Sequence, residues 1–517
     1  MHSHPFALPL LLALAGAILS LVAEKACIVP KSAREGKRGP FLLRLGVWFW
    51  AYASILLVTG RPIFSLALAL ALFVTLILVN NAKYETLKEP FIFQDYDYFL
   101  DTIRCPRLFL PFFGVKAFLL ASLIIGAALA LFLWEEPPKA RFAPFGQLGA
   151  VIFLLLLGTG LVRLTSKVRI SLDPVRDLED FGYLNCLYLY ARAQKGFSGA
   201  VSPLTSEEAY ARARSATARL GGATRLPHLV AVQSESFFDP RPLWAGIDKA
   251  VLAELDALQR ESVLSGSLLV PARGANTIRT EFAFLTGIEE RELGIHRFNP
   301  YRAIAHGWRV SALPGLLKDL GYTTICLHPY MGSFYFRDKI FPQMGFDHFL
   351  DIRSFAHAPK DGAYIADEAL ARRILEALEK ATTPLFILAI TMENHGPLQL
   401  EHMEENKARA FYTEELPKGL EELNVYLRHL KNADHMIGLL RENFDANPYP
   451  VSLCWYGDHI PIMPRAYAIF GEPEGTVPYA LWNNKALARE RKTTNRTMRL
   501  SAHELAGHWL GCAGLCV

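Results

Sequence analysis

From about residue 225 onward, the chain carries acids and histidines after short apolar runs. The residues are Glu235, His395, Asp458 and His459. Each one alone is weak evidence, because a single acid or histidine near a strand end is more often a solvated or capped loop residue. Brought together by folding, they form an oxygen and imidazole site suited to manganese, zinc or magnesium. The set therefore predicts a divalent metal site.

A hydroxyl nucleophile is available in the glycine-containing segment 274–282, where Thr277 precedes an expected short helix. A helix N-terminus favours anions. A threonine hydroxyl is a poor nucleophile near pH 7, but coordination to a dication removes its proton and orients it. Taken without the metal ligands, Thr277 is better explained as a helix N-cap.

The segment 328–338 combines an arginine with several aromatic residues. Arg337 can hold a phosphate group, and the aromatic rings can wall a small polyol. The alternative is a structural ion pair between Arg337 and Asp338 or another acid.

The elements that must position these residues are short buried strands alternating with helices. Apolar runs typical of buried parallel strands occupy 228–232, 323–327, 385–390 and 451–455. Helical patterns lie between them at 248–261, 311–320, 365–381 and 417–443. This alternation predicts a three-layer α/β sandwich, whose ligands bind at the carboxyl ends of the strands.

The first third of the chain is much more apolar than the rest. Hydrophobic residues make up 51% and charged residues 20% of the 517 residues. Stretches of membrane-spanning length occupy 6–23, 41–59, 62–80, 109–134 and 148–164. We therefore expect a transmembrane domain of about five helices over 1–165, a linker and helical connector over 166–224, and a catalytic α/β domain over 225–517.

Charge and cysteine content exclude some functions. A net charge of +4 is close to neutral for 517 residues and gives no indication of nucleic acid as a partner. The seven cysteines form no CxxC pair and no zinc-finger spacing. Only Cys512 and Cys516 are close together, and packing explains them better than a disulfide or a ligand pair.

Four segments in this order resemble the lipoteichoic acid synthase family, which includes phosphoglycerol transferases of periplasmic glucans and belongs to the alkaline phosphatase and sulfatase superfamily. The segments are 233–237, 277–282, 334–338 and 456–459. The resemblance implies a sulfatase-like α/β domain with one manganese ion, for which magnesium or zinc are alternatives. The metal ligands that it implies are Glu235, Thr277, Asp458 and His459.

By the same resemblance, Thr277, His395 and Arg337 are catalytic, and the substrate is bound by Arg337, His395, His328 and Tyr335. The family often has tryptophan where this chain has Tyr335, and Asn276 and Arg279 replace residues of the Gram-positive polymerases. Decoration of a glycan is therefore expected rather than polymerisation of teichoic acid.

The implied activity is a two-step phosphoglycerol transfer from phosphatidylglycerol through Thr277 to a glycan or glucan outside the cytoplasm. The alternatives are a phosphoethanolamine transferase, another metal-dependent phosphodiesterase or sulfatase-like hydrolase, and a non-catalytic membrane receptor or scaffold. A sulfatase needs a Cys or Ser nucleophile in a Cys-x-Pro-x-Arg context, which residues 276–279 lack.

The implied location is a bacterial inner membrane, with several spans and the catalytic domain facing the periplasm or exterior. The first loop conflicts with this orientation. Its cationic residues are Lys31, Arg34, Lys37, Arg38 and Arg44. The positive-inside rule keeps such a loop in the cytoplasm, and five crossings would then leave the catalytic domain inside. Either one candidate does not cross, or the rule fails at this loop.

Overall fold

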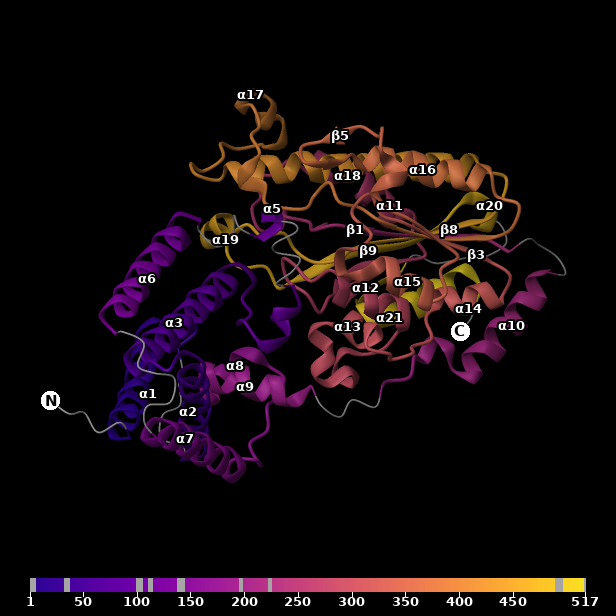
Figure 1. The fold of residues 1–517 in the computed structure, drawn as a ribbon. Helices are drawn as coiled ribbons and strands as arrows, with labels where there is room; N and C mark the ends of the chain where they lie inside the picture. Colours follow the sequence, from indigo (N-terminus) through magenta and orange to yellow (C-terminus); the bar gives the residue numbers. More distant parts are fainter. Residues whose placement is uncertain are drawn as a thin grey trace. The chain divides into compact units, whose positions relative to one another are not determined.

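A computed structural model divides the chain into two compact units, Met1–Gly196 and Phe197–Val517 (Figure 1). The structure describes residues 6–31, 38–98, 106–109, 115–136, 145–194, 199–221, 226–488 and 496–515. The division falls inside the expected connector 166–224, whose described parts are largely helical. Its helices are α8 (Pro174–Phe181) and α9 (Tyr183–Ala193) in the first unit and α10 (Glu207–Gly221) in the second.

The first unit is built from long apolar helices. These are α1 (Ala7–Cys27), α2 (Arg38–Thr59), α3 (Pro62–Leu87), α6 (Val115–Glu135) and α7 (Phe145–Leu164). By length and composition, four of the described helices can cross a membrane, namely α1, α2, α3 and the stretch Gly146–Leu164 of α7. The remaining expected span, 109–134, is represented by α6, although residues 110–114 lie outside the described residues. Exposed side chains such as Ile18 and Val58 suit contact with lipid.

Arg44 is part of the helix bundle and was wrongly counted among the charges of the first loop. Its Nη1 lies 2.6 Å from Glu24 Oε2, and both side chains are buried. The other oxygen of Glu24 accepts a hydrogen bond from the backbone N–H of Tyr183 at 2.9 Å. A buried arginine must be paired, so this contact joins α1 and α2. Arg34 and Lys37 lie outside the described residues.

The second unit contains an eight-stranded sheet. In spatial order its strands are β10 (Arg496–Ser501), β2 (Leu264–Leu269), β9 (Thr476–Asn483), β8 (Val451–Gly457), β1 (His228–Ser234), β7 (Leu385–Ile390), β3 (Thr323–Leu327) and β4 (His348–Leu350). All neighbours are parallel except β9, which runs antiparallel to β8 and to β2. The four predicted strands form the contiguous centre β8-β1-β7-β3, in which β8, β1 and β7 are buried on both faces and β3 is partly buried.

Helices cover both faces of the sheet, as Figure 1 shows. One layer contains α11 (Ala253–Glu261), α16 (Asp367–Glu379) and α18 (Glu421–Ala446). The other contains α12 (Ile278–Thr286), α13 (Pro300–Ala305), α14 (Leu313–Asp319), α15 (Arg337–Gln343) and α21 (Ala502–Ala513). The predicted combination of apolar membrane helices and a three-layer α/β domain is confirmed.

The sequence missed the outer strands β2, β4, β9 and β10, together with the small hairpin formed by β5 (Lys360–Asp361) and β6 (Tyr364–Ile365). The short strand β4 and the polar strands β2 and β10 lack the continuous apolar runs of the central strands, whereas β9 has such a run over residues 477–482 that the sequence analysis did not use. In β10, the first four of six residues are exposed, so no burial pattern marks it as a strand.

Candidate active site

A cavity of about 30 Å³ lies at the carboxyl ends of β1 and β7, beside the start of α12. Six of the eight predicted site residues line it. They are Glu235, Thr277, His328, Tyr335, Arg337 and His395. The other two, Asp458 and His459, follow β8 and contact this group. The parallel neighbours β8, β1 and β7 bring Glu235, His395, Asp458 and His459 to one edge of the sheet, where the end of β3, the start of α12 and the turn into α15 add the other four residues.

Glu235, Asp458 and His459 form a buried group whose ligand atoms lie within 4.8 Å of one another. His459 Nε2 is 3.7 Å from Glu235 Oε1, 3.4 Å from Asp458 Oδ2 and 3.4 Å from Thr277 Oγ1. The opposite ring nitrogen, Nδ1, donates to the carbonyl oxygen of Ile460 at 3.1 Å. This hydrogen bond leaves the lone pair of Nε2 directed at the carboxylates, as a metal-binding imidazole requires.

The electrostatics of this group also fit a divalent cation. Asp458 Oδ2 is buried and has no hydrogen-bond partner among the described residues. Burial, followed by the charge of Asp458, raises the pKa of Glu235 to about 8, and His459 opposes this rise. Two adjacent buried carboxylates are therefore matched by only one imidazole. A bound cation would supply the missing positive charge, so the residues present fit the metal that the sequence predicted.

Backbone contacts hold the acids in place. Asp458 Oδ1 accepts hydrogen bonds from the backbone N–H groups of Ser236, at 2.7 Å, and His459, at 2.8 Å. Gly457 lets β8 and the turn after β1 come close, because a Cβ there would lie 2.2 Å from the carbonyl oxygen of Phe237. Any other residue at position 457 would push the two ligand-bearing turns apart.

Thr277 stands at the N-cap of α12, but its side chain makes no capping hydrogen bond. Its hydroxyl instead lies within reach of His459. The preceding residue, Asn276, has a positive φ of 62°, which non-glycine residues adopt rarely and mostly where function or turn geometry requires it. The N-cap explanation for Thr277 therefore lacks its defining contact, and the nucleophile interpretation stays a prediction.

Arg337 pairs with Glu281, not with the neighbouring Asp338. Its Nε is 3.1 Å from Glu281 Oε1 and its Nη2 is 2.9 Å from Oε2, with both side chains buried. Glu281 also accepts hydrogen bonds from Tyr301 and Gln233. This geometry anchors the guanidinium from one side, while Arg337 still lines the cavity.

The two cavity histidines are neutral near pH 7, because burial lowers the pKa of both His328 and His395. Their Nδ1 atoms donate to backbone carbonyl oxygens, at 3.2 Å to Ile390 for His328 and at 2.6 Å to Gly396 for His395. His328 Nε2 accepts from Arg337 Nη1 at 3.2 Å. In His395, Nε2 remains as the acceptor nitrogen, so this ring suits an O–H donor better than an anionic oxygen.

Glu281 belongs to the predicted segment 277–282, but the sequence analysis gave it no role, and its pairing with Arg337 was missed. Its spacing of four from Thr277 places the two residues one turn apart near the start of one helix, and this spacing could have revealed it.

The aromatic turn before α15 was expected to wall a ligand. In the structure Tyr335 and Phe336 have positive φ values of 56° and 58°, and Arg337 lies 5.3 Å from the Tyr335 ring centre.

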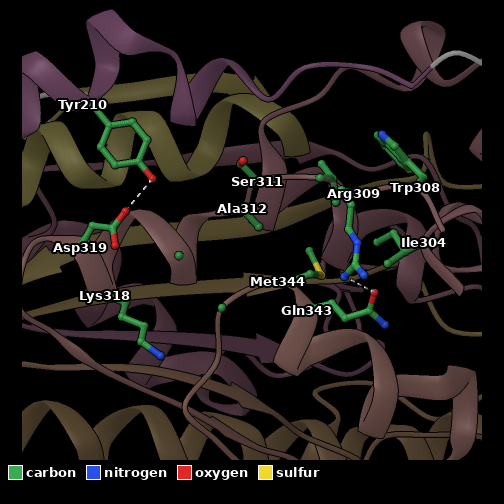
Figure 2. A pocket seen from close by; sticks show the side chains of 13 residues that line it. Tyr210, Ile304, Trp308, Arg309, Ser311, Ala312, Lys318, Asp319, Gln343 and Met344 are labelled. Carbon is green, nitrogen blue, oxygen red and sulfur yellow. Dashed lines mark hydrogen bonds between the residues drawn. The ribbon is translucent and has the colours of Figure 1, made fainter.

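A larger groove of about 340 Å³ lies elsewhere in the second unit (Figure 2). Its polar residues bond to one another: Tyr210 donates to Asp319 at 3.1 Å, and Arg309 donates to Gln343 at 3.2 Å. Asp319 ends α14 shortly before β3 begins, so the groove lies where the parallel strands start, opposite their carboxyl ends. It contains none of the predicted site residues.

The fold, with its buried acid and histidine group at the carboxyl ends of the strands, is that of an α/β sandwich enzyme. The family model described as Sulfatase matches residues 227–515, and the chain belongs to this family.

Individual relatives agree with the resemblance predicted from the sequence. The chain is 27% identical over 469 residues to the capsular polysaccharide biosynthesis protein RkpI of Rhizobium meliloti, covering 87% of this chain and 83% of that protein. It is 26% identical over 153 residues to lipoteichoic acid synthase 1 of Bacillus subtilis, covering 29% of this chain and 23% of that protein.

Among solved structures, the chain is similar to the phosphoglycerol transferase GacH of Streptococcus pyogenes in complex with sn-glycerol-1-phosphate. The TM-score is 0.47 and the sequence identity 18%, with 61% of this chain and 85% of that chain covered.

Proposed function

We propose that the protein is a membrane-anchored phosphoglycerol transferase that moves phosphoglycerol from phosphatidylglycerol to a glycan outside the cytoplasm. The observation that carries the proposal is the placement of Thr277 Oγ1 3.4 Å from His459 Nε2, beside two buried acids and Arg337. Phosphoryl transfer through a covalent intermediate requires a nucleophile, a metal site and a positively charged side chain, here Arg337, that binds the phosphoryl oxygens.

Mn²⁺ is the metal we propose, held by Glu235, Thr277, Asp458 and His459. When bound, such a cation would lower the pKa of the threonine hydroxyl and offset charge on the phosphoryl oxygens. The protein itself supplies the positions: the turns after β1 and β8 hold the acids, and α12 presents Thr277 at its N-terminus, where anions are favoured.

In the first step Thr277 Oγ attacks the phosphorus. The new Oγ–P bond forms as the bond from phosphorus to the diacylglycerol oxygen breaks, and the hydroxyl proton passes to the departing diacylglycerol. Arg337, anchored by Glu281, would donate hydrogen bonds to the phosphoryl oxygens. Because Glu281 holds the guanidinium in one orientation, these donors are preorganised.

In the second step an acceptor hydroxyl attacks the same phosphorus, and the Oγ–P bond breaks. His395 is neutral and its Nε2 is an acceptor, so it would take the proton of the entering hydroxyl as a general base. That proton then passes to the departing Thr277 Oγ, which restores the threonine hydroxyl and the neutral imidazole. A glycan acceptor agrees with the role in capsular polysaccharide biosynthesis that is named for the Rhizobium relative.

For the orientation, we propose four crossings. With the first loop in the cytoplasm, four crossings place the second unit outside, whereas five would place it inside. Four is also the number of described helices that meet the length and composition criteria. This arrangement reconciles the positive first loop with an extracytoplasmic catalytic domain.

The test is incubation of the purified full chain with Mn²⁺ and fluorescent phosphatidylglycerol, followed by lipid separation and peptide mass analysis. Release of diacylglycerol, with a glycerophosphate adduct on Thr277, is expected. Release from phosphatidylethanolamine alone would instead assign a phosphoethanolamine transferase. Release from neither lipid would remove the donor assignment.

Sulfate-ester hydrolysis is the second candidate, because the matching family model carries that name. The residue at the nucleophile position argues against it. Thr277 stands where a sulfatase needs Cys or Ser, and the proline of that context is missing. Turnover of an aryl sulfate without turnover of phosphatidylglycerol would favour this candidate.

A further inference from the structure

A second group of acids with one histidine surrounds Glu393, two residues before His395. Asp361, Glu393 and His429 offer ligand atoms that lie within 4.8 Å of one another. Glu393 Oε1 is 3.0 Å from His429 Nδ1 and 2.6 Å from Asn432 Nδ2. Glu393 and His429 are each 1% exposed, whereas Asp361, in the small hairpin, is partly exposed. The group is thus mostly buried, with one side open to entry of an ion.

The orientation of His429 suits coordination. Its Nε2 lies 3.1 Å from Glu401 Oε2, while Nδ1 faces Glu393. A carboxylate on one ring nitrogen orients the other nitrogen and raises its basicity, an arrangement common behind metal-binding histidines. Arg428 Nη2 donates to the same oxygen of Glu401 at 2.5 Å and lies 2.8 Å from His429 Nε2, which keeps Glu401 in place.

Asp367 is an independent indication of a missing cation. Its side chain is 1% exposed, and neither carboxylate oxygen has a hydrogen-bond partner among the described residues. Its backbone N–H donates to Glu393 Oε2 at 2.7 Å, so this acid begins α16 directly beside the group. A buried carboxylate without partners is costly.

The charges of the group do not balance. Three carboxylates, from Asp361, Glu393 and Glu401, contact the cations Arg428 and His429. Even with His429 protonated, one negative charge remains in excess, and Asp367 adds a buried acid without a hydrogen-bond partner among the described residues. A divalent cation would balance this charge together with that of an ionised Asp367.

We propose that Asp361, Glu393 and His429, together with Asp367, bind a second divalent metal ion of the Mn²⁺ or Zn²⁺ type, which mixed oxygen and imidazole ligands favour. The ligands come from the β5–β6 hairpin, the turn after β7, α18 and the start of α16. The ion would tie these elements together and so hold the turn that carries His395. The site is separate from Glu235, Asp458 and His459 and does not depend on the proposed transfer reaction.

The test counts metal ions. Full-length protein in detergent is stripped with EDTA and dialysed against MnCl₂ and, separately, ZnCl₂, and bound metal per chain is measured by mass spectrometry. We expect two ions in the unaltered protein, one in Asp361→Asn, one in Glu235→Gln, and none when both changes are combined. Glu368→Gln is the matched control, because this acid lies on α16 beside Asp367 but is exposed and paired with Arg372. It should keep two ions.

Two results would overturn the second site: a single ion that disappears only in Glu235→Gln, or two ions retained in Asp361→Asn. A single ion that disappears only in Asp361→Asn would support the second site and refute the first. Asp361 is partly exposed, so its substitution should leave the fold intact. Glu393→Gln then provides a second variant, expected to bind one ion and to lose the rise in Tm that the second ion gives.

Discussion

A groove and a cavity among the described residues of the second unit differ in the state of their polar groups as well as in size. The groove around Trp308 is about 340 Å³ and the cavity around Thr277 about 30 Å³. In the groove, Asp319 and Arg309 have hydrogen-bond partners. At the cavity, Asp458 keeps a buried oxygen without one among the described residues. Unbalanced buried charge at the carboxyl ends of strands, rather than volume, marks the place where chemistry is expected.

The largest expected effect comes from removing the hydroxyl of the small cavity. Thr277→Ala should lower turnover of phosphatidylglycerol by at least about a thousand-fold, because the proposed covalent step is lost. Diacylglycerol release measures it. Thr277→Ser keeps a hydroxyl and serves as the control, with partial activity expected. Full activity in Thr277→Ala would refute the role of Thr277 as the nucleophile. The cavity would then have no better claim than the groove to be the active site.

The buried ion pair behind the cavity should matter for both stability and rate. Glu281→Gln leaves Arg337 buried with only neutral partners, which should lower the free energy of unfolding by about 3–5 kcal/mol. Thermal unfolding of the full chain in detergent measures this as a fall in Tm. The double variant Glu281→Gln with Arg337→Met should be less destabilised than the sum of the single changes. Strict additivity would show that the two side chains do not act as a pair.

Stability of the metal-free protein should depend on pH through Glu235. Its pKa is about 8 in the folded chain and near 4.5 when unperturbed, so the folded state binds more protons between these values. Stability therefore falls as pH rises from about 4.5 to 8, and added Mn²⁺ should reverse the loss at pH 8. Tm measured in EDTA across this range tests the slope. If Tm falls equally steeply with pH in Glu235→Gln, another titratable side chain causes the pH dependence of stability.

The smallest effect is expected in the groove. Arg309→Gln should leave kcat/KM within about two-fold and Tm nearly unchanged, because Arg309 is an exposed residue bonded to Gln343. Arg337→Gln is the matched change at the cavity and should be far more damaging. A ten-fold loss in Arg309→Gln would mean that the groove also binds substrate and would end the contrast between the two hollows.

The central strands were accessible from the sequence because each depends on a local pattern, whereas the roles of the site residues came from the family resemblance and stay a prediction. Continuous apolar runs marked β1, β3, β7 and β8, and the polar residue after a run marked the sheet edge. The apolar run 477–482 of β9 shows the same pattern, but the pattern does not reveal the direction of that strand. Its antiparallel place between β8 and β2 is decided by tertiary pairing across distant segments.

Pairings between distant residues were also beyond the sequence. Arg337 has an acid immediately after it, yet it pairs with Glu281, 56 residues earlier in the chain. Arg44 similarly pairs with Glu24 inside the helix bundle instead of remaining a loop charge. In both cases burial selects the partner, since a buried guanidinium needs a carboxylate within contact distance and sequence spacing does not determine which acid that is.

The close approach at Gly457 has a consequence for mutational tolerance. A methyl group there would lie 2.2 Å from the carbonyl oxygen of Phe237 and 3.0 Å from Val477. The obstruction is backbone and cannot rotate away, unlike a flexible side chain. In a library randomised at this codon and selected for activity, glycine should be the only survivor, even though position 457 contributes no side chain to the reaction.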